Sequence, residues 1–152
     1  MAPVAGGQEV LVQQLSGVDA SFLYAETPSI FTHVSALILF DPHGGDGASL
    51  AGTKRLFAER LPLLDPMRRR LVTVPFDLDH PYWIEDPDLD LDFHIRETAV
   101  PPPGTDEQLA ELVSRLIARP LDRSRPLWEL YVINGLADGR IAQLTKVHHA
   151  AV

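Results

Sequence analysis

Two adjacent histidines, His148 and His149, are the residues of this chain best suited to chemistry. An imidazole titrates near neutrality, so a histidine at the end of a strand that projects into a cleft can act as a general base. Neighbouring strand residues point to opposite faces, so the two rings do not readily chelate one ion together. A His-His pair by itself is structural more often than catalytic, and the pattern alone leaves both roles open.

Other sites fit the sequence poorly. Asp88, Asp90 and Asp92 have the spacing that opens a calcium loop, but Phe93 stands where a glycine is needed and Ala99 where a bidentate Glu belongs. The chain has no G-x-S-x-G elbow and no glycine-rich phosphate loop with its lysine. It has no cysteine, which excludes disulfides, thiolate zinc sites and cysteine nucleophiles. We therefore expect neither a metal nor a cofactor.

Two charged segments have a functional and a structural interpretation. The run Arg68 to Arg70 could bind phosphate or an anionic lipid head, although a solvated strand entrance is the favoured interpretation. A second segment surrounds Pro126 and contains Asp122, Arg123, Arg125 and Glu129. We expect it to form a salt-bridge network that locks its own turn. Trp128, at a predicted strand start, is expected in the core.

The composition is that of one soluble domain. The chain has 152 residues, 45% of them hydrophobic and 22% charged, and a domain of that size builds its own core. A net charge of −8 argues against nucleic-acid binding. No apolar run approaches the roughly 20 residues that cross a bilayer, and the N-terminus lacks a signal peptide. The expected location is the cytoplasm, with peripheral membrane contact at most.

The hydrophobic patterns predict helices and strands in alternation. Helices are predicted at 17–25, 50–61 and 106–119, with N-caps at Ser16 and Ser49 and a capping box at Thr105 and Gln108. Strands are predicted at 31–40, 71–76, 81–85, 88–95, 127–134 and 140–149. The order predicts an α/β or α+β layered fold with a mixed sheet of about five or six strands.

Three of these elements carry more detailed predictions. Residues 31–40 are largely apolar on both sides, so this strand is expected to be covered on both faces. Residues 88–95 alternate cleanly, which predicts a half-buried strand with His94 and the aspartates in water. The stripe of the helix at 106–119 is expected to pack on the sheet; it consists of Leu109, Leu112, Val113, Leu116 and Ile117.

The segment Lys146 to Val152 resembles the first five positions of the H-H-x-x-x-D-G motif of CoA-dependent acyltransferases, together with its approach. Further similarity extends from Leu15 to Val152. It includes Leu15–Leu23, Arg69–Leu71 with Val74-Pro75, Pro81–Asp86, Asp90–His94 and the nearly diagnostic Pro120–Glu129. These segments are similar to the bacterial wax ester synthase/diacylglycerol acyltransferase family, and the Arg-rich, Lys-poor style resembles its actinobacterial, particularly mycobacterial, members.

The resemblance implies a fold, a reaction and roles for residues. The fold would be one half of a chloramphenicol-acetyltransferase-like acyltransferase. Residues 1–14 would be a flexible N-terminus and 15–152 the N-terminal acyltransferase domain, truncated within the motif and without its C-terminal domain. The family moves a fatty acyl group from acyl-CoA to diacylglycerol or a long-chain alcohol, which makes triacylglycerol or wax ester. His149 would be the general base, acyl-CoA a co-substrate rather than a cofactor, and the supporting residues His148, Asp122, Arg125, Pro126, Trp128 and Glu129.

Two other functions compete with the acyltransferase. Truncation could leave a catalytically silent lipid-binding or interaction domain. A condensation domain of peptide assembly shares the His motif, but the segments at 15–23 and 120–129 disfavour it. The isolated chain is expected to be inactive, to self-associate through the apolar face left open by its missing half, and to contact membranes or lipid droplets peripherally.

Overall fold

The computed structural model describes residues 12–41 and 45–152. Most of the expected flexible N-terminal segment, 1–14, therefore lies outside the described residues. Its last two residues, Gln13–Gln14, form strand β1, which pairs antiparallel with β4 (Tyr82–Glu85). The paired chain thus begins before the predicted boundary at residue 15.

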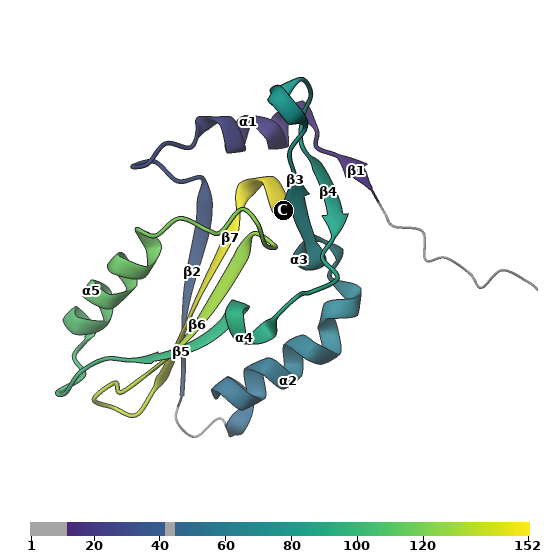
Figure 1. Ribbon diagram of the computed structural model, residues 1–152. Helices are drawn as coiled ribbons and strands as arrows, with labels where there is room; N and C mark the ends of the chain where they lie inside the picture. The colour runs from purple at the N-terminus through teal and green to yellow at the C-terminus, as the bar shows by residue number, and fades with distance from the viewer. Residues whose placement is uncertain (1–11, 42–44) are drawn as a thin grey trace, which may run out of the picture.

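A four-stranded mixed sheet forms the centre of the fold (Figure 1). Its order is β2 (His33–Phe40), β7 (Ile141–His148), β6 (Trp128–Asn134) and β5 (Ile95–Ala99). β5 runs parallel to β6, and the other two pairs are antiparallel. The tight turn between β6 and β7 contains Gly135 and Gly139, both at positive φ, which a glycine adopts without strain. The predicted mixed sheet and its hairpin are confirmed.

Helices cover this sheet on opposite faces (Figure 1). Tyr131 and Ile133 of β6 pack with the apolar stripe of α5 (Asp106–Ile117). The alternate residues Trp128, Leu130 and Val132 pack with side chains of α2 (Leu50–Arg60). β6 is therefore buried on both faces, and the packing predicted for the stripe of α5 is confirmed.

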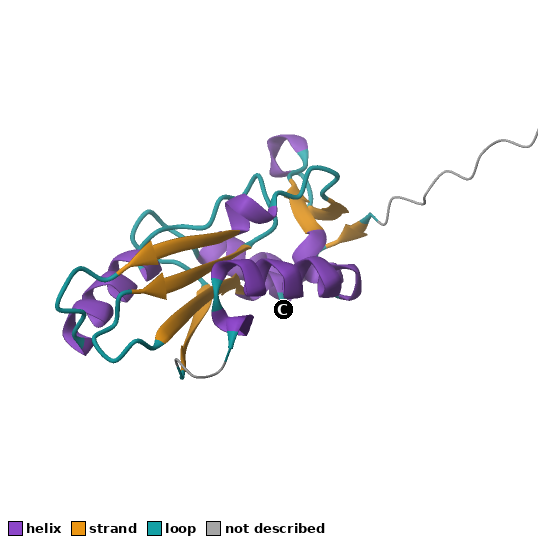
Figure 2. Ribbon diagram, turned by 90° about the horizontal axis from the view of Figure 1, so that it is seen from below, coloured by secondary structure: helices purple, strands orange, loops and turns teal. Residues whose placement is uncertain are grey.

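A second sheet stands apart from the first, as the view in Figure 2 shows. Its order is β1-β4-β3, with β3 at Arg69–Val72. Proline lacks the N–H that a strand ladder needs, and Pro75 and Pro81 follow β3 and precede β4. The predicted single sheet of five or six strands is wrong, because the short strands pair with one another.

Helix α1 (Gly17–Ala25) covers this second sheet and begins at the predicted cap, where Ser16 Oγ accepts the Asp19 N–H. Leu23 of α1, Leu71 of β3 and Trp83 of β4 share one buried cluster with Ala150 near the C-terminus. This cluster holds the end of β7 against α1. The caps predicted at Ser49 and at Thr105 with Gln108 are also confirmed.

The strand predicted at 88–95 is wrong. The residues form a turn followed by the short helix α4 (Leu91–His94), which leads into β5. The aspartates act as local acceptors: Asp90 Oδ1 binds the Asp92 N–H at 2.8 Å, and Asp86 Oδ1 binds the Asp88 N–H at 3.2 Å. Aspartates that bond to the backbone two residues on favour turns and caps over strands. His94, expected in water, is fully buried.

The prediction that β2 is covered on both faces is also wrong. β2 is the edge of the sheet, and four of its apolar side chains are 42–51% exposed: Val34, Leu37, Ile38 and Leu39. Helices α2 and α5 bury the central strand β6, whereas the apolar run of β2 lies at the edge of the sheet and stays exposed. On α2, Leu56 is likewise 50% exposed.

The remaining elements are short. One turn of helix, α3 (Asp65–Arg68), precedes β3, which ends at Val72 rather than at the predicted residue 76. Single 3-10 turns lie at Asp46–Ala48, Leu61–Leu63, Pro75–Asp77 and His149–Ala151.

Candidate functional site

The two histidines stand in different settings at the end of β7. Even-numbered residues of β7 are buried on the α5 side of the sheet, and His148 is the last of them, 1% exposed. His149 begins the His149–Ala151 turn and stays partly exposed. Its ring stacks on Phe22 of α1, with 4.8 Å between centroids and 18° between planes. The chain thus places one imidazole inside and the other at the rim.

His148 is held at both ring nitrogens. Its Nδ1 accepts the Ala150 N–H at 3.0 Å, so the ring proton must lie on Nε2. Nε2 lies 3.1 Å from Thr32 Oγ1 and 3.2 Å from Glu26 Oε1. The Thr32 hydroxyl donates to the Phe22 carbonyl at 2.9 Å, which leaves its oxygen free to accept.

Burial lowers the pKa of His148, and the nearby Glu26 carboxylate opposes that shift only in part. For Glu26 itself, burial raises the pKa, but hydrogen bonds from the Thr32 N–H and Arg123 outweigh it, and the net pKa is lowered. A neutral imidazole therefore faces an ionised carboxylate at neutral pH. This is the pairing that fixes a histidine in one tautomer.

His149 is positioned through its backbone as well as its ring. Its N–H donates to the Thr32 carbonyl at 3.0 Å, across the register that pairs His33 with His148. Its neighbour Ala150 is buried in the cluster shared with α1. A partly exposed imidazole on a fixed backbone can accept a proton from a bound hydroxyl group.

The segment 120–129 was expected to form one salt-bridge network, and this expectation is wrong. Asp122 accepts hydrogen bonds from the Ser124 N–H at 2.9 Å and the Ser124 hydroxyl at 2.7 Å. Arg123 leaves the turn and donates to the Leu23 carbonyl at 2.8 Å and to Glu26 at 2.7 Å. Arg125 approaches Asp122 only at 3.7 Å and lies over the Phe93 ring at 4.1 Å.

The end of this segment enters the core, since Pro126, Trp128 and Glu129 are all buried. Trp128 is 1% exposed and stacks on His94, and its indole N–H donates to the Met67 carbonyl at 2.8 Å. Its predicted core position is confirmed. Glu129 lies 2.6 Å from Arg96 and 3.7 Å from Lys146. Glu129 therefore pairs with cations of β5 and β7, the two strands that flank β6.

The arginine run is largely occupied by neighbouring carboxylates. Arg68 pairs with Asp65 at 2.6 Å and also with Glu85, while Arg69 lies 3.4 Å from Asp65. Arg70 approaches Asp86 at 3.8 Å. The structural interpretation of this run is the one that the contacts favour.

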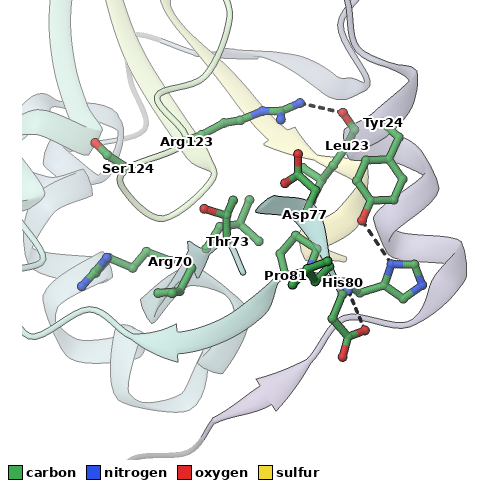
Figure 3. Close-up of a pocket in the computed structure, with 13 residues that line it drawn as sticks. Leu23, Tyr24, Arg70, Thr73, Asp77, His80, Pro81, Arg123 and Ser124 are labelled. Atoms are coloured by element: carbon green, nitrogen blue, oxygen red, sulfur yellow. Dashed lines mark hydrogen bonds between the residues drawn. The ribbon is translucent and has the colours of Figure 1, made fainter. Parts of the chain in front are cut away.

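An open groove of about 1010 Å³ lies between α1 and β3 (Figure 3). Arg70, Asp77, His80 and Arg123 line it, and Tyr24 Oη lies 3.1 Å from His80 Nδ1. His149 is not among its lining residues. Within residues 12–41 and 45–152, no cluster of three or more His, Asp or Glu side chains is placed to hold a metal ion.

The sequence profile described as "Wax ester synthase/diacylglycerol acyltransferase catalytic domain" matches residues 15–152. The chain belongs to this family. The wax ester synthase/diacylglycerol acyltransferase match covers both histidines, the 120–129 segment and α1, which are the parts that build the site.

Individual relatives agree with the family match. The chain is 43% identical over 143 residues to "Probable diacyglycerol O-acyltransferase tgs3" of Mycobacterium tuberculosis, covering 93% of this chain and 52% of that protein. It resembles the solved "Wax ester synthase/diacylglycerol acyltransferase from Marinobacter aquaeolei VT8" with a TM-score of 0.78 and 35% identity. That match covers 92% of this chain and 34% of the solved one. The chain thus spans about a third to a half of the length of such relatives.

A condensation domain shares only the fold. The first condensation domain of the CDA synthetase superposes with a TM-score of 0.67 at 14% identity, over 91% of this chain and 34% of that chain. Such low identity supports a common architecture and no common substrate. The predicted half of a chloramphenicol-acetyltransferase-like fold is consistent with these neighbours.

Sequence reasoning missed Glu26 and Thr32. Both lie in the segment that links α1 to β2, and Glu26 directly precedes a Thr-Pro turn, where no local pattern marks a functional carboxylate. They meet His148 only because β2 and β7 pair in a register that sets His33 opposite His148. Only the pairing of strands far apart in the sequence reveals them.

Proposed function

We propose that this domain is the general-base portion of an O-acyltransferase that moves a fatty acyl group from acyl-CoA to diacylglycerol or a long-chain alcohol. The observation that carries the proposal is the placement of His149, partly exposed on a fixed turn at the end of β7. The family match supports the reaction class, and the relatives' printed names support these acceptors.

The chemistry balances with a single base. The acceptor hydroxyl gives its proton to His149 as its oxygen attacks the thioester carbon. The tetrahedral intermediate then expels CoA through its sulfur, which takes that proton from the His149 imidazolium. A hydroxyl is a poor nucleophile while protonated, and a positioned base contributes about 10²–10⁴-fold in rate. No acyl-enzyme is required, because the thioester is already activated.

The partners proposed with this function are acyl-CoA, the lipid acceptor and the remaining portion of a protein of the relatives' length. Within the described residues, no helix is both long and apolar enough to cross a bilayer. We propose that contact with a membrane or lipid droplet is peripheral and that the location is cytoplasmic.

The second candidate is a catalytically silent lipid-binding or interaction domain. The exposed apolar side chains of β2 favour it, because an uncovered apolar edge recruits partners. The two candidates differ in turnover rather than in fold.

The test compares two proteins: residues 1–152 alone, and a full-length acyltransferase, meaning a chain of the relatives' length that contains these residues. Each is incubated with radiolabelled acyl-CoA and either diacylglycerol or a long-chain alcohol, and the products are separated by thin-layer chromatography. We expect labelled ester from the full-length protein and none from residues 1–152 alone. Absence of ester from both proteins with either acceptor would contradict the acyltransferase proposal and favour the silent domain.

A further inference from the structure

The backbone N–H and the ring of His149 both contact the corner where α1, the segment leading to β2 and the segment 120–129 meet. The His149 N–H is bound by the Thr32 carbonyl, and the Thr32 N–H is bound in turn by Glu26 Oε1 at 3.0 Å. Thr32 Oγ1 holds the carbonyl of Phe22, the residue on which His149 stacks. Thr32 therefore holds the His149 backbone through its own carbonyl, and its hydroxyl holds the backbone of Phe22, on whose ring His149 stacks.

The second connection runs through His148. Its Nδ1 is the acceptor that caps the His149–Ala151 turn through the Ala150 N–H. Nδ1 accepts only while the ring proton stays on Nε2. Nε2 faces two acceptors, the neutral Thr32 Oγ1 at 3.1 Å and Glu26 Oε1 at 3.2 Å, and of the two only Glu26 is anionic. A ring with its proton on Nδ1 would present a donor to a donor and would release the turn.

Glu26 is suited to this task by its own partners. Its side chain is 15% exposed, and Arg123 holds its other oxygen at 2.7 Å while also binding the last turn of α1 through the Leu23 carbonyl. These bonds keep the carboxylate ionised and oriented, consistent with its lowered pKa. Glu26 thus touches both connections to His149 without contacting His149 itself.

We propose that Glu26 is a positioning residue that fixes His148 as the Nε2–H tautomer and thereby holds His149 in place for proton abstraction. The role of His149 rests on the proposed function; the tautomer and the turn do not. A group displaced by about 1 Å loses on the order of 10²-fold in rate, so a positioning residue here affects kcat.

The first experiment needs no activity. Residues 1–152 are prepared as wild type, Glu26→Ala, Glu26→Gln and Glu111→Gln, the last a matched control in an exposed ion pair with Arg115. Side-chain ¹⁵N NMR then reports the tautomer of His148, and hydrogen exchange reports the Ala150 amide. We expect pure Nε2–H in the wild type and in the Glu111 variant. Glu26→Ala should give mixed tautomers and faster Ala150 exchange, and Glu26→Gln, which keeps an acceptor oxygen, should lie between them.

The second experiment measures kcat and KM in the full-length acyltransferase with the same substitutions. We expect Glu26→Ala to lower kcat by about 100-fold with little change in KM, and Glu26→Gln to recover part of that loss.

An unchanged tautomer in both Glu26 variants, or a kcat equal to wild type in Glu26→Ala, would overturn the positioning role. A wild-type enzyme without turnover would instead contradict the proposed function and leave the NMR result standing. If Glu26→Ala does not fold, the Glu26→Gln spectra and kcat decide.

Discussion

His149 and His148 are chemically identical side chains that differ in what surrounds them. His148 is enclosed, bonded at both nitrogens and held neutral by burial, which lowers its pKa. His149 keeps an imidazole at the rim, supported by Phe22 on one face. This difference supports the proposed proton-accepting role of the second histidine, because a base needs access to the hydroxyl it deprotonates.

Replacement of His149 by Ala tests that assignment. In the full-length acyltransferase, we expect His149→Ala to reduce kcat by about 10²–10⁴-fold while the thermal midpoint of unfolding stays close to wild type, since the side chain is only partly buried. His80→Gln, in a histidine that contacts Tyr24 rather than the β7 turn, serves as control. A His149→Ala enzyme that retained most of its kcat would refute the general-base role.

At the scale of elements, α5 is attached to the sheet by a buried lysine as well as by its apolar stripe. Lys146 of β7 is fully buried, and its Nζ donates to the carbonyls of Leu116 at 3.0 Å and Arg119 at 2.7 Å. These carbonyls stand at the C-terminal end of α5, where a cation complements the helix dipole. Burial lowers the pKa of Lys146, and Glu129 at 3.7 Å opposes the shift.

Removal of this ammonium group should loosen α5. We expect Lys146→Met to lower the free energy of unfolding by about 3 kcal/mol, because it leaves two carbonyls and part of the Glu129 charge without a partner. Lys54→Met removes the other lysine, whose partner Asp92 is 80% exposed, and should cost at most about 1 kcal/mol. Urea unfolding measures both. Equal effects of the two substitutions would contradict a special role for the buried lysine.

At the scale of the whole molecule, the burial of His33, His94 and His148 connects stability to pH. Burial lowers the pKa of His33, His94 and His148 from the ordinary value of 6.5. As pH falls through 6.5, the unfolded chain takes up protons that the folded chain does not, so the free energy of unfolding decreases. The lowered carboxylates, such as Glu26, add a similar loss only below their unfolded value of 4.5.

We therefore expect the urea midpoint of the chain to fall steadily between about pH 7 and pH 5. His94→Phe, which keeps a ring stacked on Trp128 and removes one titrating group, should flatten that slope. A midpoint independent of pH over this interval would show that the buried histidines do not couple to folding.

The exposed edge of the large sheet predicts association. An uncovered apolar edge strand pairs readily with another chain, and natural proteins block such edges with lysine. We expect light scattering of residues 1–152 to give a mass above 16.8 kDa and Ile38→Lys to restore the monomer. Leu56→Lys is a matched control, because Leu56 on α2 is 50% exposed and Ile38 is 51% exposed. A wild-type monomer at high concentration, or an equal effect of the control, would contradict association through β2.

The sequence by itself determined what depends on neighbouring residues. The helix at 17–25, the capping box at Thr105, the stripe of α5 and the β6–β7 hairpin follow from side chains within a few positions of one another. The family could be identified from residue types in the sequence alone, without knowledge of the fold. The strand predicted from the aspartates at 88–92 is wrong because aspartates at every second position also fit a series of turns.

The tertiary structure alone decided which strand is central, which is an edge, and what faces His148. β2 and β6 are both apolar runs, yet α2 and α5 bury β6 and leave apolar side chains of β2 exposed. Glu26 and Thr32 reach His148 through the antiparallel register of β2 on β7, a non-local pairing that no local pattern contains. Burial and long-range contacts arise from how the elements pack, so His148 gains these partners only when β2 pairs with β7.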